Sequence, residues 1–294
     1  MKKIALLLFS VALLLAACSE KSELSPDPTP GHTEAEKIPI KISTTITKVN
    51  ETGFEQGDQV GIYVVNEPNT LQPSGNHANN VLFKYINGSW VSESPLYWKD
   101  QTTKADFYCY YPYDSSISSI DAYPFSIKAD QSSDNNYKSN DFLWGKTGYV
   151  SPTTQAVGIT VKHILSNVII KLVAGNGYTD EDMNSAEVTI CGMQTNSTIN
   201  LANGTITANG NIQDITPKMG VNARQALVIP QSITNTDIIK ITVGDKTYVL
   251  NQSINLVSGK QYTCTVTINK TSQGINIGIG GWNVDDNDFG GIVE

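Results

Sequence analysis

The 294-residue sequence predicts an all-β protein with two tandem antiparallel β-sandwich domains. Apolar and polar residues alternate in many short segments, a pattern that places one set of side chains on one face of a strand. Pairs that tolerate the positive φ of tight hairpins separate these segments, namely Asn87-Gly88, Asn203-Gly204 and Gly244-Asp245. An aromatic-rich first half gives way to a half rich in Asn, Thr and Ile, so we expect a domain boundary between residues 152 and 153.

The first 17 residues have the layout of a secretory signal peptide. Lys2-Lys3 is a basic start, residues 4–15 are apolar, and Ala16-Ala17 supplies small residues before the cut. Cys18 follows directly, as in a bacterial lipobox, where the Cys is acylated, for example by palmitate, and becomes the mature N-terminus. Acyl chains hold a protein on a membrane because each buried methylene adds roughly 0.8 kcal/mol. The position after Cys18 is Ser19 and lacks the Asp that favours retention in the inner membrane. We therefore expect the lipoprotein to be anchored in the outer membrane.

Residues 18–36 are predicted to be a disordered tether. They are rich in Pro, Ser, Thr and Glu, and three prolines are evenly spaced. Such a composition cannot bury a core. The folded part then comprises an N-terminal domain, residues 37–152, and a C-terminal domain, residues 153–294.

The alternating segments after the tether are expected to be strands. The first of them contains Ile38, Ile40, Ile42 and Ile46. Later ones lie at residues 60–64, 107–111, 157–161, 239–243 and 262–268. The apolar residues of 164–172 fit a helix as well as a strand, and this alternative stays open.

Composition limits the partners and the chemistry. Asp and Glu outnumber Lys and Arg by 28 to 20, so phosphate backbones repel the chain and nucleic acid is not an expected partner. Beyond Cys18 the chain has Cys109, Cys191 and Cys264, each in an alternating apolar segment. We expect them to be small buried hydrophobic residues, with one disulfide left open.

No catalytic residue, cofactor or metal site is predicted, so the chain is not expected to be an enzyme. His32, His77 and His163 lack metal-ligand spacing and a nucleophile partner, and His163 is expected to be structural. The acidic run 285–288 lacks the ligand series of a calcium loop and predicts a solvated turn. Core packing explains the alternating aromatic residues within 83–113.

Five segments carry a family resemblance through their order and spacing. They are Phe54-Glu55-Gln56-Gly57-Asp58-Gln59-Val60-Gly61-Ile62-Tyr63, Tyr110-Tyr111-Pro112-Tyr113 after Lys104-Ala105-Asp106-Phe107, Asp141-Phe142-Leu143-Trp144, Lys162-His163-Ile164-Leu165-Ser166-Asn167-Val168 and Ile279-Gly280-Gly281-Trp282. Together they resemble the fimbrillin family, the pilins and pilus-associated lipoproteins of type V pili on Gram-negative surfaces. The match covers nearly all of the mature chain. It implies two transthyretin-like β-sandwiches and a fimbrium component for cell adhesion.

The resemblance also implies a route of assembly. Family members are exported as acylated precursors, and a trypsin-like protease at the cell surface removes the first strand together with the lipid. The open groove then accepts a strand from another subunit, so the expected partners are other fimbrillin subunits, of the same or another kind. A host or bacterial surface ligand is a further expected partner. A vacated strand site exposes unpaired backbone groups and apolar pockets, and a strand in trans satisfies both.

The removable strand and its cleavage site have counterparts in this sequence. The strand would be the isoleucine segment from Ile38 to Ile46, and the usual arginine after it is replaced by Lys48. Arg224 is the only arginine of the chain, so an Arg-specific protease would instead cut in the second domain. Either a protease that accepts lysine acts at Lys48, or the protein stays anchored.

A donor strand is expected near the C-terminus. Its candidate residues are Ile275, Ile277, Ile279, Ile292 and Val293. The same pattern fits the last strand of the second domain paired in cis, and both possibilities stay open. A second function also stays open, that of a permanently lipid-anchored surface lipoprotein that binds glycans or a partner protein through aromatic-lined loops of residues 83–113.

Overall fold

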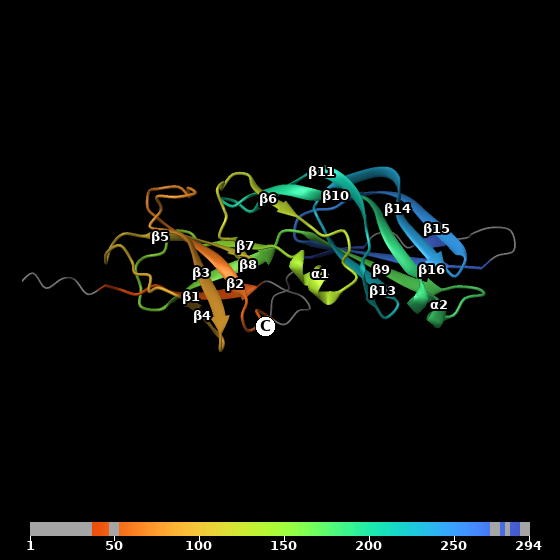
Figure 1. The fold of residues 1–294 in the computed structure, drawn as a ribbon, viewed down its shortest axis with the longest axis horizontal. Coiled ribbons are helices and arrows are strands. Elements are labelled where there is room, and N and C mark those ends of the chain that lie inside the picture. The colour runs from red at the N-terminus through yellow and green to blue at the C-terminus, as the bar shows by residue number, and fades with distance from the viewer. Residues whose placement is uncertain (1–36, 47–52, 271–276, 280–282, 289–294) are drawn as a thin grey trace, which may run out of the picture. The chain divides into compact units, whose positions relative to one another are not determined.

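The computed structural model describes residues 37–46, 53–270, 277–279 and 283–288. The predicted signal peptide, Cys18, the tether and Lys48 lie outside these residues. Regular structure in the described part is almost entirely β, which confirms the predicted fold class (Figure 1). Two short helices also occur there, α1 (Asp134–Ser139) and α2 (Asp180–Ser185), and the sequence pattern predicts neither. No helix of the described part is long and apolar enough to cross a membrane.

The first sheet is strongly curved around its own apolar core. Among the described residues it has seven strands, in the spatial order β1 (Lys41–Ile46), β8 (Ala156–His163), β7 (Leu143–Lys146), β5 (Ala105–Tyr111), β2 (Gln59–Asn66), β3 (Ala78–Ile86) and β4 (Ser89–Ser92). The alternating residues of β1, β2 and β8 point into this core, as their period of two requires. β2 is buried on both faces, and Tyr63 on its other face joins the core of the second half of the chain.

Two further sheets pack face to face in the second half of the chain. One contains β11 (Thr205–Ile215), β10 (Glu187–Asn200), β14 (Ser232–Val243) and β15 (Lys246–Asn255), with β6 (Tyr123–Ser126) beside β10. The other contains β12 (Lys218–Gly220), β13 (Ala223–Val228), β9 (Ser166–Ala174), β16 (Lys260–Ile268), β17 (Ile277–Ile279) and β18 (Asn283–Asp288). Their facing side chains form one apolar cluster, which gives a β-sandwich.

The sheets differ from the prediction in three respects. β8 belongs to the first sheet, so the change of sheet falls after His163 and not at the predicted boundary between residues 152 and 153. β1 pairs with β8, and β9 with β16, in parallel, because each pair is joined by a long connection that brings the chain back in the same direction. The acidic run 285–288 lies in β18 and is not a turn.

The two alternatives left open for residues 164–172 are resolved as a strand, because β9 begins at Ser166. The predictions for the hairpin turns are confirmed. Asn87 and Gly88 both have positive φ in the β3–β4 turn, and Gly244 does so in the β14–β15 turn. Hairpins of this kind favour such residues because the turn has to match the right-handed twist of the strands.

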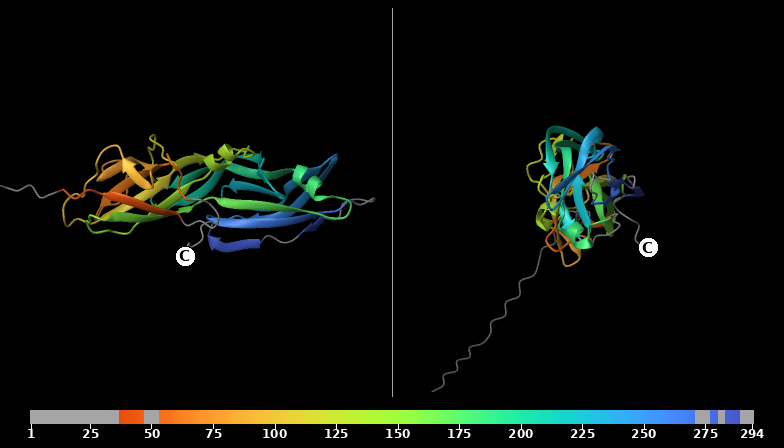
Figure 2. Two further views of the ribbon diagram at one scale, coloured as in Figure 1. Left: turned by 90° about the horizontal axis from the view of Figure 1, so that it is seen from below. Right: turned by 90° about the vertical axis from the view of Figure 1, so that its right-hand side faces the viewer.

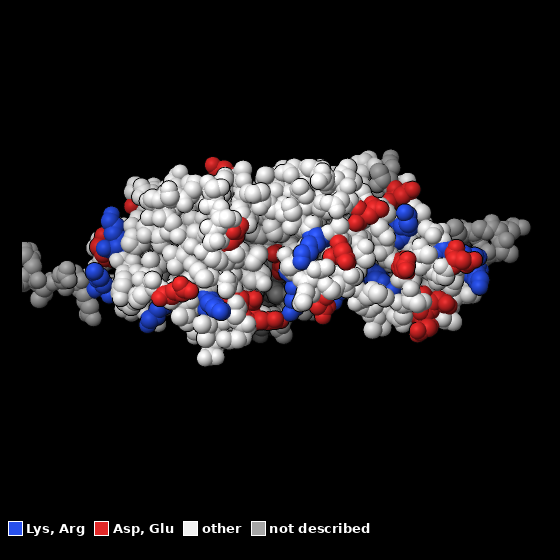
Figure 3. Space-filling view, in the orientation of Figure 1, with Lys and Arg blue, Asp and Glu red and all other residues white. Residues whose placement is uncertain are grey.

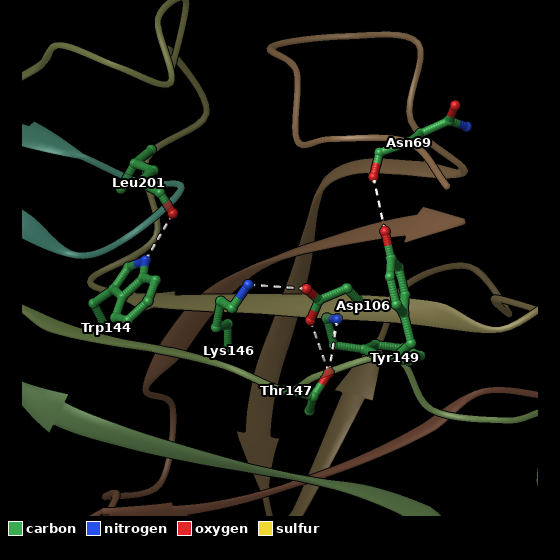
Figure 4. Close-up of polar contacts among 8 residues, drawn as sticks. Asn69, Asp106, Trp144, Lys146, Thr147, Tyr149 and Leu201 are labelled. Atoms are coloured by element: carbon green, nitrogen blue, oxygen red, sulfur yellow. Dashed lines mark hydrogen bonds and ion pairs between the residues drawn. The ribbon is translucent and has the colours of Figure 1, made fainter. Parts of the chain in front are cut away.

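The β10–β11 turn is held against the first sheet by Trp144 of β7. The indole Nε1 of Trp144 donates a hydrogen bond to the carbonyl oxygen of Leu201 at 2.8 Å (Figure 4). Gly204 follows in the turn with φ +73°, and a Cβ there would lie 2.4 Å from Cε3 of Trp144. A glycine is therefore required by the backbone and by the close approach of the ring.

Arg224, the only arginine, ties α2 to β13. The side chain is 1% exposed, and its guanidinium donates to backbone carbonyl oxygens only. Its Nη2 contacts the carbonyls of Met183, Asn184 and Ala186 at 3.2, 2.8 and 2.6 Å. These carbonyls end α2, whose last turn carries no basic residue of its own. The guanidinium thus supplies the positive charge and the donors that a helix C-terminus lacks.

Candidate functional site

The candidate site is the edge of the first sheet that β1 occupies. β1 has a single neighbouring strand among the described residues, β8, and pairs with it from Lys41↔Ala156 to Ile46↔Val161. Figure 1 shows β1 in the part of the chain that also contains β8. The predicted isoleucine segment therefore lies at an edge, where it can leave without breaking any other strand pair.

The residues before β1 are held on a second side. Pro39 forms an antiparallel bridge with Tyr97. The amide of Ile40 donates to the carbonyl oxygen of Leu96 at 2.7 Å, and the amide of Trp98 donates to that of Ile38 at 2.9 Å. The segment from 38 to 46 is thus bounded by β8 along its whole strand and by residues 96–98 at its start.

The inward side chains of this segment complete the core of the first sheet. Ile40 and Ile42 are buried, and Ile38 and Ile46 pack partly buried against the same cluster. The cluster also contains Val157, Ile159, Val161, Trp90 and Trp98, which together with the main chain of β8 we call the β1 groove. Without β1 these apolar side chains would face water.

One inward position of β1 is polar. Thr44 lies between Ile42 and Ile46 on the inner face and opposite Ile159 of β8. Its Oγ1 accepts a hydrogen bond of 2.7 Å from the indole Nε1 of Trp90. An indole nitrogen can only donate, so Thr44 supplies the acceptor that this buried group needs. The sequence signal for this pair is the single break in the alternating isoleucines, which the sequence analysis did not use.

The Trp90 ring is held in place by neighbouring aromatic rings. Phe54 meets it edge-on with ring centroids 4.8 Å apart, and Tyr85, its cross-strand partner in β3, lies at 5.1 Å. Trp98 is fixed separately, since its Nε1 donates to the carbonyl oxygen of Thr153 at 3.2 Å. Trp90 and Trp98 are buried, so neither forms an exposed platform for stacking sugars.

β8, which forms the wall of the groove, is supported on its other side by β7. β7 pairs with β8 at Leu143↔His163 and Trp144↔Lys162. The close approach of β7 to β8 occurs at Gly145. A Cβ at this position would lie 2.1 Å from the carbonyl oxygen of Thr160. The two backbones can approach this closely only because the residue is glycine.

Polar contacts also fix β7 and the residues after it to the rest of the first sheet. Nζ of Lys146 lies 3.1 Å from Oδ2 of Asp106 in β5, and Oγ1 of Thr147 donates to Oδ1 of the same carboxylate at 3.1 Å (Figure 4). The hydroxyl of Tyr149 donates to the carbonyl oxygen of Asn69 at 3.3 Å.

The other predicted site residues are only partly described. Lys48, Ile275, Ile292 and Val293 lie outside the described residues. Ile277 and Ile279 lie in β17, which pairs with β16 of the same chain, and the choice between cis and trans pairing stays a prediction. β17 and β18 lie at the outer edge of their sheet, where β18 is drawn in dark blue (Figure 2).

Burial corrects the prediction for Arg224. Because its side chain lies inside the folded chain with five carbonyl acceptors, an Arg-specific protease cannot reach this position in the native protein. The prediction that such a protease cuts in the second domain is wrong for the folded state. The arginine has a structural role.

The three cysteines that the structure describes are free, and two of them are buried as predicted. Cys109 and Cys264 are buried and Cys191 is half-buried. Burial raises the pKa of all three thiols, to about 11 for Cys264, and so disfavours the reactive thiolate.

The buried His163 has the structural position expected for it. Its Nδ1 lies 2.6 Å from Oδ1 of Asp141, which ties β8 to the residues before β7. No group of three or more metal-binding side chains occurs within the described ranges. On the face shown in Figure 3, positive and negative side chains are interspersed and much of the surface is uncharged.

Comparison with known proteins identifies the class. The all-β fold, with sandwich packing and an apolar strand at a sheet edge, hosts many functions, so the family has to come from sequence similarity. The model of the family described as "Fimbrillin-like" matches residues 47–282. The chain therefore belongs to the fimbrillin-like family, which confirms the resemblance.

The relatives agree with this assignment. The chain is 27% identical over 299 residues to the "Putative fimbrium subunit Fim1C" of Bacteroides uniformis, with 96% of each chain covered. Its fold is similar to the crystal structures of two proteins, each described as a "putative cell adhesion protein". The one from Bacteroides uniformis has a TM-score of 0.68 at 22% identity and the one from Bacteroides ovatus 0.70 at 21%. Both comparisons cover 88% of this chain, with 99% and 100% of the respective structures.

Proposed function

We propose that this chain is a fimbrium subunit that assembles by strand exchange at the β1 groove. It is exported as a lipoprotein precursor acylated at Cys18, anchored in the outer membrane, and cut after Lys48. Removal of residues 18–48 then opens the groove to a strand from another fimbrillin subunit at the cell surface. The observation that supports this proposal is the position of β1, an edge strand with inward isoleucines that ends two residues before Lys48.

The energetics favour refilling of the groove. Burying one isoleucine side chain contributes roughly 1.5–3 kcal/mol, and the segment 38–46 buries Ile40, just before β1, and Ile42 of β1. The edge of β8 also loses its backbone partners along Lys41–Ile46 when β1 leaves. A strand that restores both the apolar contacts and the ladder therefore binds to a preformed site.

The C-terminal segment is the proposed donor strand. Its described part, β17 and β18, has one neighbouring strand, β16, so it can also leave its sheet without breaking other strand pairs. The proposed donor comprises Ile275, Ile277, Ile279, Ile292 and Val293, paired in cis or in trans according to the state of assembly. We propose the cis pairing for the unassembled subunit.

Limited trypsin treatment of the purified precursor tests this function. The expected product begins at Val49 and forms oligomers on unboiled gels and in electron micrographs. The matched control is Lys48→Gln, which removes the cleavage site while leaving the described part of the chain unchanged, and which should stay monomeric under the same treatment. A product that begins at Val49 and remains monomeric at high concentration would refute the proposal.

A further inference from the structure

The β1 groove contains one feature that apolar strand exchange does not explain. Its inner surface is apolar at Val157, Ile159 and Val161, but the indole N–H of Trp90, which is 9% exposed, donates to Oγ1 of the half-buried Thr44. A strand with apolar side chains at every inward position would leave this donor without an acceptor. A buried donor without a partner costs free energy, even when the surrounding contacts are good.

We propose that the groove selects its occupant by a hydroxyl group. The strand it binds in place of β1 carries apolar residues at two successive inward positions, followed by Thr or Ser at the third. This inference rests on the proposed function and names the partner chemistry of the same site. Trp90 is the residue that determines this specificity.

The selection is specific because neighbouring rings restrict rotation of the Trp90 indole, whose N–H is the donor. Phe54 and Tyr85 contact the Trp90 ring from two directions and fix the direction of its N–H group. Trp98, the other indole beside β1, already donates to the carbonyl oxygen of Thr153 and needs nothing from the occupant. The requirement is therefore confined to the one inward position that Thr44 fills.

The start of the strand sets the register of the occupant. Residues 38–40 are hydrogen-bonded to Leu96 and Trp98 on one side, while β8 pairs with the residues that follow on the other. A segment that slips by two residues would bring an apolar side chain, in place of the hydroxyl, to Trp90.

The C-terminal segment of this chain does not meet the requirement. In the direction of β1, placing Ile275 and Ile277 at the positions of Ile40 and Ile42 brings Ile279 to the position of Thr44. The register shifted by two residues brings Gly281 there. Neither side chain can accept a hydrogen bond. In these two registers the groove therefore binds this segment more weakly than it binds a strand with Thr or Ser at the third inward position.

Peptide exchange into the full chain, nicked after Lys48, tests the inference. The probe is a fluorescent peptide with the sequence of residues 37–48, and its displacement of the native strand is followed by anisotropy. Unlabelled competitors are the same peptide, its Thr44→Val and Thr45→Val forms, and a peptide of residues 271–283. Thr45 points outward to solvent in β1 and so provides the matched control.

The expected result is that Thr44→Val and the C-terminal peptide compete about 5- to 100-fold more weakly, the range for a buried donor left without a partner. Thr45→Val should compete as well as the unchanged peptide. In a chain carrying Trp90→Phe, which removes the N–H but keeps an aromatic ring, the difference between Thr44 and its valine form should disappear.

The outcomes separate the inference from the proposed function. Equal competition by the Thr44→Val and unchanged peptides, or strong competition by the C-terminal peptide, overturns the hydroxyl requirement and leaves strand exchange standing. A persistent Thr44 preference in the Trp90→Phe chain assigns the selectivity to another group and also overturns it. If no peptide displaces the strand from the nicked chain, both the proposed function and the inference fail. The Lys48→Gln chain, which keeps β1 covalently attached, measures non-specific binding.

Discussion

Replacement of Arg224 by methionine tests how strongly a single buried cation holds the second sandwich together. The substitution keeps a long unbranched side chain but removes the charge and all five hydrogen bonds to carbonyl oxygens. The main effect falls on α2, whose terminal carbonyls at Met183 and Ala186 are bonded to the guanidinium in a buried environment.

The magnitude follows from the number of carbonyls left without a donor. Each buried polar group that loses its partner costs about 1–3 kcal/mol. The Ala186 carbonyl loses its guanidinium donor, whereas the Met183 carbonyl keeps a long hydrogen bond of 3.4 Å from the amide of Ala186. Removing the guanidinium also relieves the desolvation that lowers the pKa of Arg224, which offsets part of the loss. We expect Arg224→Met to lower the free energy of unfolding by about 3 kcal/mol. Arg224→Lys, with a shorter reach and three donors, should lose about 2 kcal/mol.

Urea unfolding followed by circular dichroism measures these changes through the shift in midpoint at constant slope. Lys171→Met is the matched control, because Lys171 is an exposed cation in β9, directly opposite Ala223 of β13. Its expected effect is within about 0.5 kcal/mol. An Arg224→Met chain as stable as this control would show that the guanidinium contacts contribute nothing net.

Three further predictions concern the cores and the turns. Burial raises the pKa of Tyr63 from its ordinary value to about 12. Above pH 10 the unfolded chain therefore loses a proton that the folded chain keeps, so the free energy of unfolding should fall between pH 10 and 12. The fall should be less steep in Tyr63→Phe. Gly204→Ala should destabilise by about 2–3 kcal/mol through backbone strain and an indole clash, whereas Gly244→Ala, with positive φ but open space, should cost about 1 kcal/mol in urea unfolding. Cys109 and Cys264 should react with a thiol reagent only after denaturation, and protection that survives denaturation without reductant would indicate a disulfide.

Sequence patterns predicted the strands well, because alternation is a local property that a strand displays along its own length. The isoleucines of the first strand, the hairpin pairs and the 164–172 segment all have the expected local structure. The predicted domain boundary did not coincide with the change of sheet, since composition carries no information on which distant strand β8 pairs with. The burial of Arg224 could not be predicted either, because three of its five carbonyl acceptors lie 38 to 41 residues away in the chain.

The sequence by itself determined that the chain is all-β, that an alternating isoleucine segment precedes Lys48, and that the family is fimbrillin-like, because periodicity and short motifs are local properties of the sequence. Only the tertiary structure decided that this strand lies at a sheet edge in parallel with β8 and that Trp90 donates to Thr44. Both features depend on which residues distant in the sequence become neighbours. That choice is made by the packing of the whole core, and no local pattern encodes it.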